Sequence, residues 1–241
     1  FVEEGDLAAY LVPTDSSVDA VWRDRTFDDS AWSTGATGIG YERSSGYESL
    51  IDTDVESLMY GTNETAYIRM PFEVTYAGGV SDMTLRMKFE DGFVAYINGQ
   101  EVASHNAPAT LSWNSGATDL NGDGSAVVWQ DFDVSSGIDD LVSGTNVLAI
   151  HGLNRSRTSS DFLILPQLVG EAADQIFGVD AMYPPDGSYL STAPGQITVE
   201  FSADVDAATV AASDLRVNGQ PATGYTLDDP STITFDLPAL G

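Results

Sequence analysis

The sequence predicts an all-β protein made of short strands packed as a sandwich or jelly roll. Apolar and polar residues alternate with a period of two over 83–89, which is typical of a half-buried strand. Asn-Gly pairs stand at 98–99 and 218–219, and this pair is the strongest two-residue hairpin signal. Asp outnumbers Glu by 26 to 11, and Asp favours turns and caps over helices. No amphipathic helical stretch of useful length interrupts this pattern.

The individual elements follow the same pattern along the chain. Helical turns are expected only at 28–32, at 138–142 and, as a short helical or turn segment, at 206–212. Pro71 cannot donate to a β ladder, so we expect it at an edge or a bulge. The predicted strands are 66–74, 83–89, 93–97, one starting at 100, 127–134, 146–151, 162–168, 197–201, 215–217 and 233–235.

The sequence pattern changes near 170–174, from a predicted closing strand to a segment with a turn cluster at 183–187, and this change predicts two domains, 1–172 and 173–241. The second part has only about 65 residues, a size at which a β-sandwich is barely self-sufficient. It stops at 237–241, where one or two further strands would be expected, so we interpret it as incomplete. Because the chain starts at Phe1 rather than at a Met, it is expected to be a fragment of something longer.

Composition and charge exclude several classes of function. The formal net charge is −28 and the chain has a single lysine, Lys88, so it repels phosphate backbones and anionic lipid surfaces. Cysteine is absent, which removes disulfides, thiolate metal sites and cysteine nucleophiles. No apolar run approaches the roughly 20 residues that span a membrane. Abundant Asp, scarce Lys and no Cys indicate an extracellular or cell-surface protein.

Several motifs resemble a known family. In order they are Phe-Asp-Asp-Ser-Ala-Trp at 27–32, Gly-Ile-Gly-Tyr-Glu at 38–42, 67–74, 91–102, 144–151 and Ser-Ser-Asp-Phe at 159–162. Together they resemble the galactose-binding-like jelly rolls that serve as accessory modules of large secreted bacterial proteins, including some glycosidases. The resemblance implies that fold over roughly 5–170, and often a structural calcium. The segments 184–187, 197–206 and 214–219 resemble a bacterial immunoglobulin-like domain, which implies a spacer or adhesion unit.

Nothing in the sequence indicates a catalytic centre. The two histidines, His105 and His151, lack a nucleophile-elbow pattern, and His151 stands at the end of an apparent buried strand, as expected of a core-edge histidine. Carboxylate pairs arise by chance among 37 acids, and the glycine clusters are hairpin turns rather than phosphate loops. The fragment is therefore predicted to be non-catalytic.

One loop matches part of a calcium-binding pattern. Asp119, Asn121 and Asp123, followed by Gly124, reproduce positions 1, 3, 5 and 6 of a calcium loop, in which alternating oxygen side chains wrap a hard cation. The twelfth position is Gln130 instead of Glu, so Asp131 or its neighbour 133 would have to substitute. The predicted metal ligands are Asp119, Asn121, Asp123 and Asp131. The alternatives are an Asx-rich hairpin turn without metal, or calcium at another Asp-rich loop such as 52–54.

Aromatic residues on loops suggest a sugar-binding surface, because a ring face can stack on the C–H face of a pyranose. Trp22, Trp32 and Trp129 are expected to be core or core-edge residues, whereas Trp113 lies in a predicted loop. An arginine can also fork onto the carboxylate of an acidic sugar, or pair internally with an acid such as Asp161. The predicted ligand-binding residues are Tyr41, Tyr47, Tyr60, Trp113 and Arg155.

These observations predict a non-catalytic carbohydrate-binding or adhesion module of a larger secreted or cell-surface protein, with a structural calcium. Its expected partners are a polysaccharide or glycan and the neighbouring domains of the same chain. The alternative is a purely structural spacer within a polysaccharide-degrading enzyme. An enzyme in its own right is the third possibility, and no catalytic constellation supports it.

Overall fold

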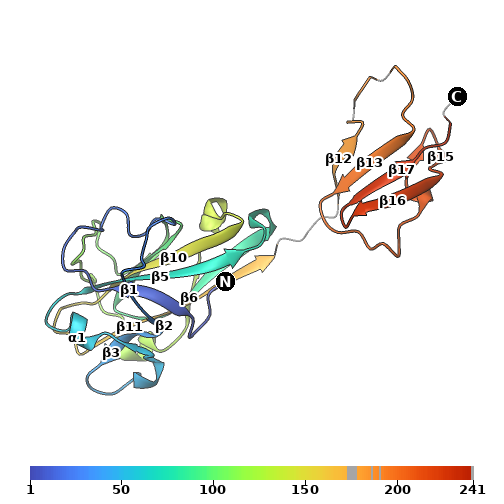
Figure 1. The fold of residues 1–241 in the computed structure, drawn as a ribbon. Helices are drawn as coiled ribbons and strands as arrows, with labels where there is room; N and C mark the ends of the chain where they lie inside the picture. The colour runs from blue at the N-terminus through green and yellow to red at the C-terminus, as the bar shows by residue number, and fades with distance from the viewer. Residues whose placement is uncertain (173–177, 186, 190, 240–241) are drawn as a thin grey trace. The chain divides into compact units, whose positions relative to one another are not determined.

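The computed structural model describes residues 1–172, 178–185, 187–189 and 191–239, and the chain splits into two compact units, Phe1–Ala173 and Asp174–Gly241. The predicted boundary between 172 and 173 adjoins the segment 173–177, which lies outside the described residues, as do positions 186, 240 and 241. Both units consist mainly of antiparallel strands, which confirms the all-β prediction (Figure 1). No helix among the described residues is long and apolar enough to cross a membrane.

The first unit contains eleven strands in two sheets, with short helical turns between them. The strands are β1 (Leu7–Leu11), β2 (Ser33–Ala36), β3 (Ile39–Glu42), β4 (Thr53–Asp54), β5 (Thr65–Val74), β6 (Val80–Glu90), β7 (Gly92–Ile97), β8 (Gln100–His105), β9 (Gln130–Asp133), β10 (Gly144–Leu153) and β11 (Asp161–Ala172). The helical turns are α1 (Glu56–Met59), α2 (Asp123–Ala126), η1 (Glu48–Leu50), η2 (Ala77–Gly79) and η3 (Ser135–Asp140).

The two sheets form a β-sandwich with one main core between them. One sheet has the order β2-β1-β5-β10-β7-β8 and the other β4-β3-β11-β6-β9, and every pair is antiparallel except β3 with β4. Alternate residues of each strand point inward, so Ile68 of β5, Phe89 of β6 and Ile164 of β11 meet in one buried cluster. The period of two in the sequence therefore has its physical cause in burial of one face of each strand.

Loops cover the outer faces of both sheets. On the six-stranded sheet, Trp22 stacks on Tyr67 of β5 with ring centroids 4.2 Å apart, and Tyr96 of β7 meets Trp22 edge-on. On the five-stranded sheet, Leu163 and Leu165 of β11 pack beneath Tyr47 and other residues of the loops. The apolar side chains of the strands beneath these loops set the positions of Trp22 and Tyr47.

Most local expectations are met, with informative differences. Asn98 and Gly99 have φ of 51° and 96°, as the predicted tight hairpin requires. Pro71 stands opposite Val147 of β10, beyond the residues of β5 that pair with β1, so its missing N–H interrupts no ladder on that side. The segment 28–32 is a turn in which Ser30 N donates to Asp28 Oδ1 (3.1 Å), rather than a helix. The turn expected at 138–142 starts earlier, as η3.

The second unit has one four-stranded sheet and a two-stranded hairpin. Its strands are β12 (Val179–Tyr183), β13 (Gln196–Phe201), β14 (Arg216–Val217), β15 (Gln220–Pro221), β16 (Gly224–Asp229) and β17 (Thr232–Asp236), with the turn η4 (Ala212–Asp214). The sheet order is β12-β13-β17-β16, and Asn218 and Gly219 form the second predicted hairpin turn. An apolar groove of about 340 Å³ lies along its core, lined by residues such as Met182, Phe201 and Leu215.

Two tryptophans of the first unit differ in burial, which gives a direct test of the packing. Trp22 is 1% exposed, whereas Trp32 is only half-buried, against Phe27 and Tyr67. We expect Trp22→Ala to lower the free energy of unfolding by about 3–5 kcal/mol, the usual range for a buried large aromatic. Trp32→Ala should cost clearly less, because solvent already reaches that ring. Urea unfolding of both variants measures the difference, and equal costs would contradict this assignment of the core.

Candidate metal centre

Three carboxylates from distant parts of the sequence meet at one end of the first unit. Glu42 ends β3, Asp161 starts β11 and Asp123 is the first residue of α2. One ligand atom from each lies within 4.8 Å of the others. Oxygens bound to one Ca²⁺ at about 2.4 Å can be at most about 4.8 Å apart, so these three carboxylates have the spacing of a shared cation.

The strand register forces these acids together. Asp161 is the antiparallel partner of Glu42, and Glu90, at the end of β6, is the partner of Leu163. Partners in adjacent strands, and residues two apart in one strand, share a face of the sheet. Glu42, Asp161 and Glu90 therefore all lie on the outer face of the five-stranded sheet, beside the cluster around Tyr47. Asp123 approaches from the loop that covers this face.

Burial and mutual repulsion disfavour the charged forms of these acids. Glu90 is 3% exposed, and its burial, together with the charges of Asp161, Asp91 and Asp123, raises its pKa to about 8. Burial also raises the pKa of Asp161, with further contributions from Asp123 and Glu42. The Tyr47 hydroxyl donates to Glu90 Oε2 at 3.2 Å and only partly offsets this effect. A positive charge at this point would relieve the repulsion.

One carboxylate oxygen at the centre is buried without a partner. Glu42 Oε1 accepts hydrogen bonds from both the backbone N–H and the hydroxyl of Ser44 at 2.7 Å, whereas Oε2 accepts none. A Cβ at Gly46 would lie 3.2 Å from Glu42 Oε2 and 3.7 Å from Asp123 Oδ2, so a glycine leaves the space beside both oxygens open. A buried, unpartnered anionic oxygen is costly, and its natural partner is a cation. These hard oxygen donors fit Ca²⁺.

Only one of the predicted metal ligands belongs to this centre. Asp123 is one of the three acids, whereas Asp131 of β9 pairs with Arg86 at 3.0 Å and Asp119 lies 3.7 Å from Arg155 Nη1. Asn121 is buried, and its side-chain amide donates to the carbonyl of Phe89 at 2.8 Å. Asp119, Asn121 and Asp131 therefore have their own contacts outside the three-carboxylate cluster, and metal binding by them stays a prediction.

The sequence pattern did not predict Glu42 and Asp161 as candidate metal ligands. Both nevertheless stand in motifs that carry the family resemblance, Gly-Ile-Gly-Tyr-Glu and Ser-Ser-Asp-Phe. Each acid adjoins a buried aromatic residue at a strand end, and that position was the available signal. The alternative loop at 52–54 forms no such cluster among the described residues, and Asp54 Oδ1 accepts the backbone N–H of Glu56 at 2.8 Å.

The predicted sugar-binding residues have different positions. Tyr41 and Tyr47 are 2% and 1% exposed, so neither ring offers a face to a ligand, and their predicted contact with sugar is not supported. Tyr41 is held by hydrogen bonds to the carbonyl of Ser159 (3.2 Å) and from Asn154 (3.1 Å). Tyr47 is instead buried beside the acidic cluster, where its hydroxyl donates to Glu90.

The other three predicted ligand residues reach the surface. Tyr60 is 36% exposed, and the Arg43 guanidinium lies over its ring at 3.7 Å. Trp113 is half-buried, and its backbone N–H donates to Asp19 at 3.0 Å. The side chain of Arg155 is 45% exposed, and its backbone N–H donates to Asp91 at 2.8 Å. Ligand contact by Tyr60, Trp113 and Arg155 stays a prediction.

The histidines have the surroundings of structural residues. His151 is 2% exposed, and its Nε2 lies 3.1 Å from Thr65 Oγ1 while its ring meets Trp22 and Tyr67 edge-on. Burial lowers its pKa to about 3, so it is neutral at physiological pH. His105 packs edge-on against Phe89 and Phe132.

No protein-family model matches the sequence, and no curated protein matches it either. Among solved structures, a β-glucuronidase from an uncultured Clostridium species is similar at 10% identity and a TM-score of 0.42, covering 83% of this chain and 33% of that chain. A calcium-binding mutant of Bacteroides uniformis β-glucuronidase 2 is similar at 15% identity and 0.44, covering 82% and 21%. A β-glycosidase from Bacteroides vulgatus is similar at 11% identity and 0.39, covering 100% and 30%. The chain thus spans a third or less of these glycosidases.

The raised pKa values predict an unusual dependence of stability on pH. In chelator, the unfolded chain loses the Glu90 proton near pH 4.5, whereas the folded protein holds it to about pH 8. Stability from this group is therefore fully present below pH 4.5 and is lost as pH rises to 8. Because each pKa unit corresponds to about 1.4 kcal/mol, we expect a loss on the order of 4 kcal/mol, or roughly 8–16 °C in Tm.

Glu90→Gln should flatten this slope, because the amide stays neutral while its oxygen can still accept from Tyr47. Glu101→Gln, on the exposed side of β8, is the matched control and should leave the slope unchanged. Thermal unfolding between pH 5 and pH 8 measures the effect. A wild-type Tm that rises over this range would contradict the description of the acidic cluster.

Proposed function

We propose that this chain is a non-catalytic, calcium-binding module of a larger extracellular or cell-surface protein, and that its first unit binds glycans. The observation that carries the calcium part is the acidic cluster, in which Glu42, Asp123 and Asp161 surround a buried oxygen without a partner. The first unit is a β-sandwich with several loops at the end that holds this cluster. The second unit acts as an immunoglobulin-like spacer or adhesion unit.

A bound calcium would tie together segments that the sheets alone do not fix. Glu42 leads into the long connection to β5, Asp161 follows the connection from β10, and Asp123 belongs to the connection between β8 and β9. Asp91 already links two of these loops, since its carboxylate accepts the backbone N–H groups of Asn121 and Arg155. The ion would add a further joint and hold the loops that carry Tyr60, Trp113 and Arg155 in one arrangement.

The alternative is a spacer that positions an enzyme elsewhere in its polypeptide without binding sugar. The burial of Tyr41 and Tyr47 favours this alternative, because it removes two of the four aromatic residues expected at a sugar-binding surface. Calcium would be structural in both cases, so the metal does not distinguish them.

Calcium should stabilise the protein beyond its effect as a salt. A cation that binds only the folded state stabilises it by roughly 2.7 kcal/mol at a hundred times its dissociation constant. We expect millimolar CaCl₂ to raise Tm more than NaCl of equal ionic strength. Glu42→Gln with Asp123→Asn should abolish this excess, since both substitutions remove charge from the cluster.

Asp119→Asn with Asp131→Asn is the matched control, because it removes the same charge from two exposed acids outside the cluster. This variant should keep the calcium response. If instead the control loses the response and the cluster variant keeps it, the ion binds at the 119–131 loop. If calcium acts no differently from sodium on the wild type, the metal proposal fails.

Glycan binding is tested on an array with the full chain, once in calcium and once in chelator. Reproducible binding to a defined class of glycan supports the binding module, and its loss in chelator supports calcium as the organiser of the loops. Binding to no glycan favours the spacer. Turnover of a polysaccharide would contradict the non-catalytic assignment.

A further inference from the structure

A groove of about 350 Å³ crosses the outer face of the six-stranded sheet, away from the acidic cluster. It exists because the segment 12–32 covers only part of this face, over Tyr67 and Ala149, and leaves the neighbouring strand positions open. Its volume lies in the range of small-molecule sites. Strands β1, β2, β5 and β10 contribute to its floor, and residues 25–29 form one wall.

The floor of the groove is apolar. Pro71 of β5 lies opposite the buried Val147 of β10, and Ala9 of β1 lies beside them opposite Arg69. Pro71 is exposed, and Leu7 of β1 is 73% exposed. The Phe27 ring, half-buried, stands at the wall. These surfaces can contact the C–H groups of a pyranose ring.

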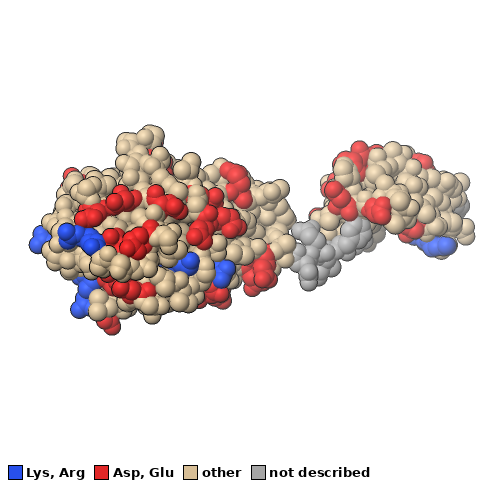
Figure 2. Space-filling model, turned by 90° about the horizontal axis from the view of Figure 1, so that it is seen from below, with Lys and Arg blue, Asp and Glu red and all other residues tan. Residues whose placement is uncertain are grey.

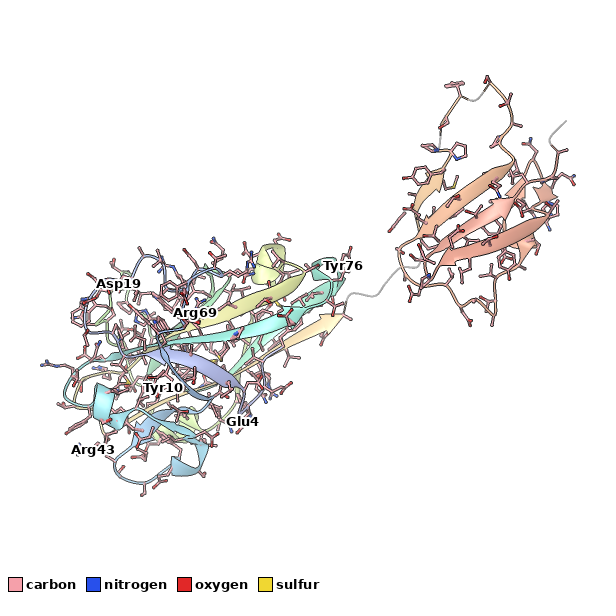
Figure 3. The ribbon with its side chains drawn as sticks, viewed as in Figure 1. Glu4, Tyr10, Asp19, Arg43, Arg69 and Tyr76 are labelled. Atoms are coloured by element: carbon pink, nitrogen blue, oxygen red, sulfur yellow. The ribbon has the colours of Figure 1, made fainter. Side chains whose placement is uncertain are left out.

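A buried arginine fixes the wall in position. The side chain of Arg69 is 2% exposed and rises from β5 toward the 12–32 segment, as Figure 3 shows. Its Nε donates to Asp29 Oδ2 at 2.7 Å, and its terminal nitrogens donate to the carbonyls of Trp22, Asp24 (3.1 Å) and Phe27 (3.4 Å). A segment held by four such bonds, three of them to its backbone carbonyls, is organised before any ligand arrives.

The wall also presents a positive charge. Arg25 is exposed, and its Nη1 donates to the backbone carbonyl of Thr145 at 3.4 Å. None of the ion pairs found among the described residues includes Arg25. The charges of Arg69 and Asp29 compensate each other, so the lining of the groove carries a net positive charge in a chain of net charge −28. A guanidinium without a carboxylate partner is suited to bind a carboxylate ligand.

We propose that this groove binds the uronic-acid residue of an acidic oligosaccharide. The sugar ring packs on Pro71 and Phe27, and its carboxylate accepts hydrogen bonds from the Arg25 guanidinium. The hydroxyl of Thr34 at the rim serves the sugar hydroxyls, and Thr145 Oγ1, which donates to Glu73 Oε1 at 2.6 Å, can accept a hydrogen bond from one of them. This inference rests on the proposed glycan-binding function, but it places the ligand on a sheet face instead of on the loops that carry Tyr60, Trp113 and Arg155.

The negative charge of the chain restricts where an acidic oligosaccharide can bind. Acidic side chains are spread over the face of the first unit seen in Figure 2, and basic ones are few. A polyuronate is repelled by most of such a surface, so binding requires a local contact that outweighs the repulsion. At about 0.15 M salt the repulsion beyond roughly 8 Å is screened, whereas a direct guanidinium–carboxylate contact in the groove persists in part.

The test uses the full chain in 0.15 M NaCl with calcium, and a tetragalacturonate and a neutral galactotetraose as probes in titration calorimetry. A second pair, a tetramer of alginate and a neutral mannotetraose, covers the other common uronate geometry. We expect the wild type to bind a uronate tetramer at least tenfold more tightly than its neutral counterpart. Arg25→Ala should weaken that binding by roughly tenfold, the loss expected for one charge-assisted contact.

Arg216→Ala in the second unit is the matched control, since that exposed arginine also donates to a backbone carbonyl, of Gly219 at 3.3 Å. It should bind like the wild type. Uronate binding that survives Arg25→Ala but is lost in Arg155→Ala would overturn the groove and leave the glycan-binding function intact. Equal affinity for the neutral tetramers would overturn the selection of uronates. If the wild type binds neither pair of tetramers, the groove is not a uronate site. If the glycan array also shows no binding, the proposed glycan-binding function fails as well.

Discussion

The pairing register of β3, β11 and β6 is the constraint on which the candidate site depends. Once Glu42 is opposite Asp161 and Glu90 is opposite Leu163, three carboxyl groups must share one face of the sheet. Shifting any strand by one residue would move its acid into the core and its aromatic or aliphatic neighbour out. The apolar core between the sheets therefore fixes the register, and through it holds like charges together at a cost that a cation can relieve.

Charged side chains are buried on both outer faces of the first unit, but their charges are compensated differently on the two faces. On the six-stranded sheet, Arg69 is buried with its own anion, Asp29, and with backbone carbonyls around its guanidinium. On the five-stranded sheet, Glu42 Oε2 has no hydrogen-bond partner, and none of the ion pairs among the described residues includes Glu42, Asp123 or Asp161. The first arrangement is complete within the chain, and it produces a rigid wall. In the second arrangement, an ion from solution would supply the missing positive charge.

The sequence predicted the long strands of the first unit, such as β5, β6, β10 and β11, because burial of alternate residues is a local pattern. It missed β1 to β4, β12 and β16, most of which are too short to show such a pattern. It predicted both Asn-Gly turns because each turn depends only on two adjacent residues that tolerate a positive φ. The metal centre was only partly predictable. Asp123 belongs to a recognisable loop pattern, whereas Glu42 and Asp161 are separated by more than a hundred positions and meet only through strand pairing. Spacing along the chain carries no information about that contact.

Burial was harder to predict than strand position, for a related reason. Tyr47 stands in a polar, glycine-containing segment that is typical of a loop, yet its ring is 1% exposed because Leu163 and Leu165 of β11 need a cover. Trp22 and Trp32 both face Tyr67, but the ring centroids are 4.2 Å apart for the buried Trp22 and 6.4 Å apart for the half-buried Trp32. Burial is decided by the strand beneath a loop, and that strand can be more than a hundred residues away in sequence, as Leu163 is from Tyr47.

The acids of this chain fall into two populations that respond to different ions. Most are exposed, so their repulsion is diffuse and any monovalent salt screens it. Among the described residues, Glu90, Asp91 and Asp161 are buried, and around them screening by mobile ions is weak. Asp91 is satisfied by backbone N–H groups, which leaves the Glu42, Asp123 and Asp161 side to be neutralised. A dehydrated divalent ion can lie between these carboxylates and neutralise them directly, whereas sodium in bulk screens only the exposed acids. The proposed calcium would therefore act on the buried acids, and ionic strength on the rest of the net charge of −28.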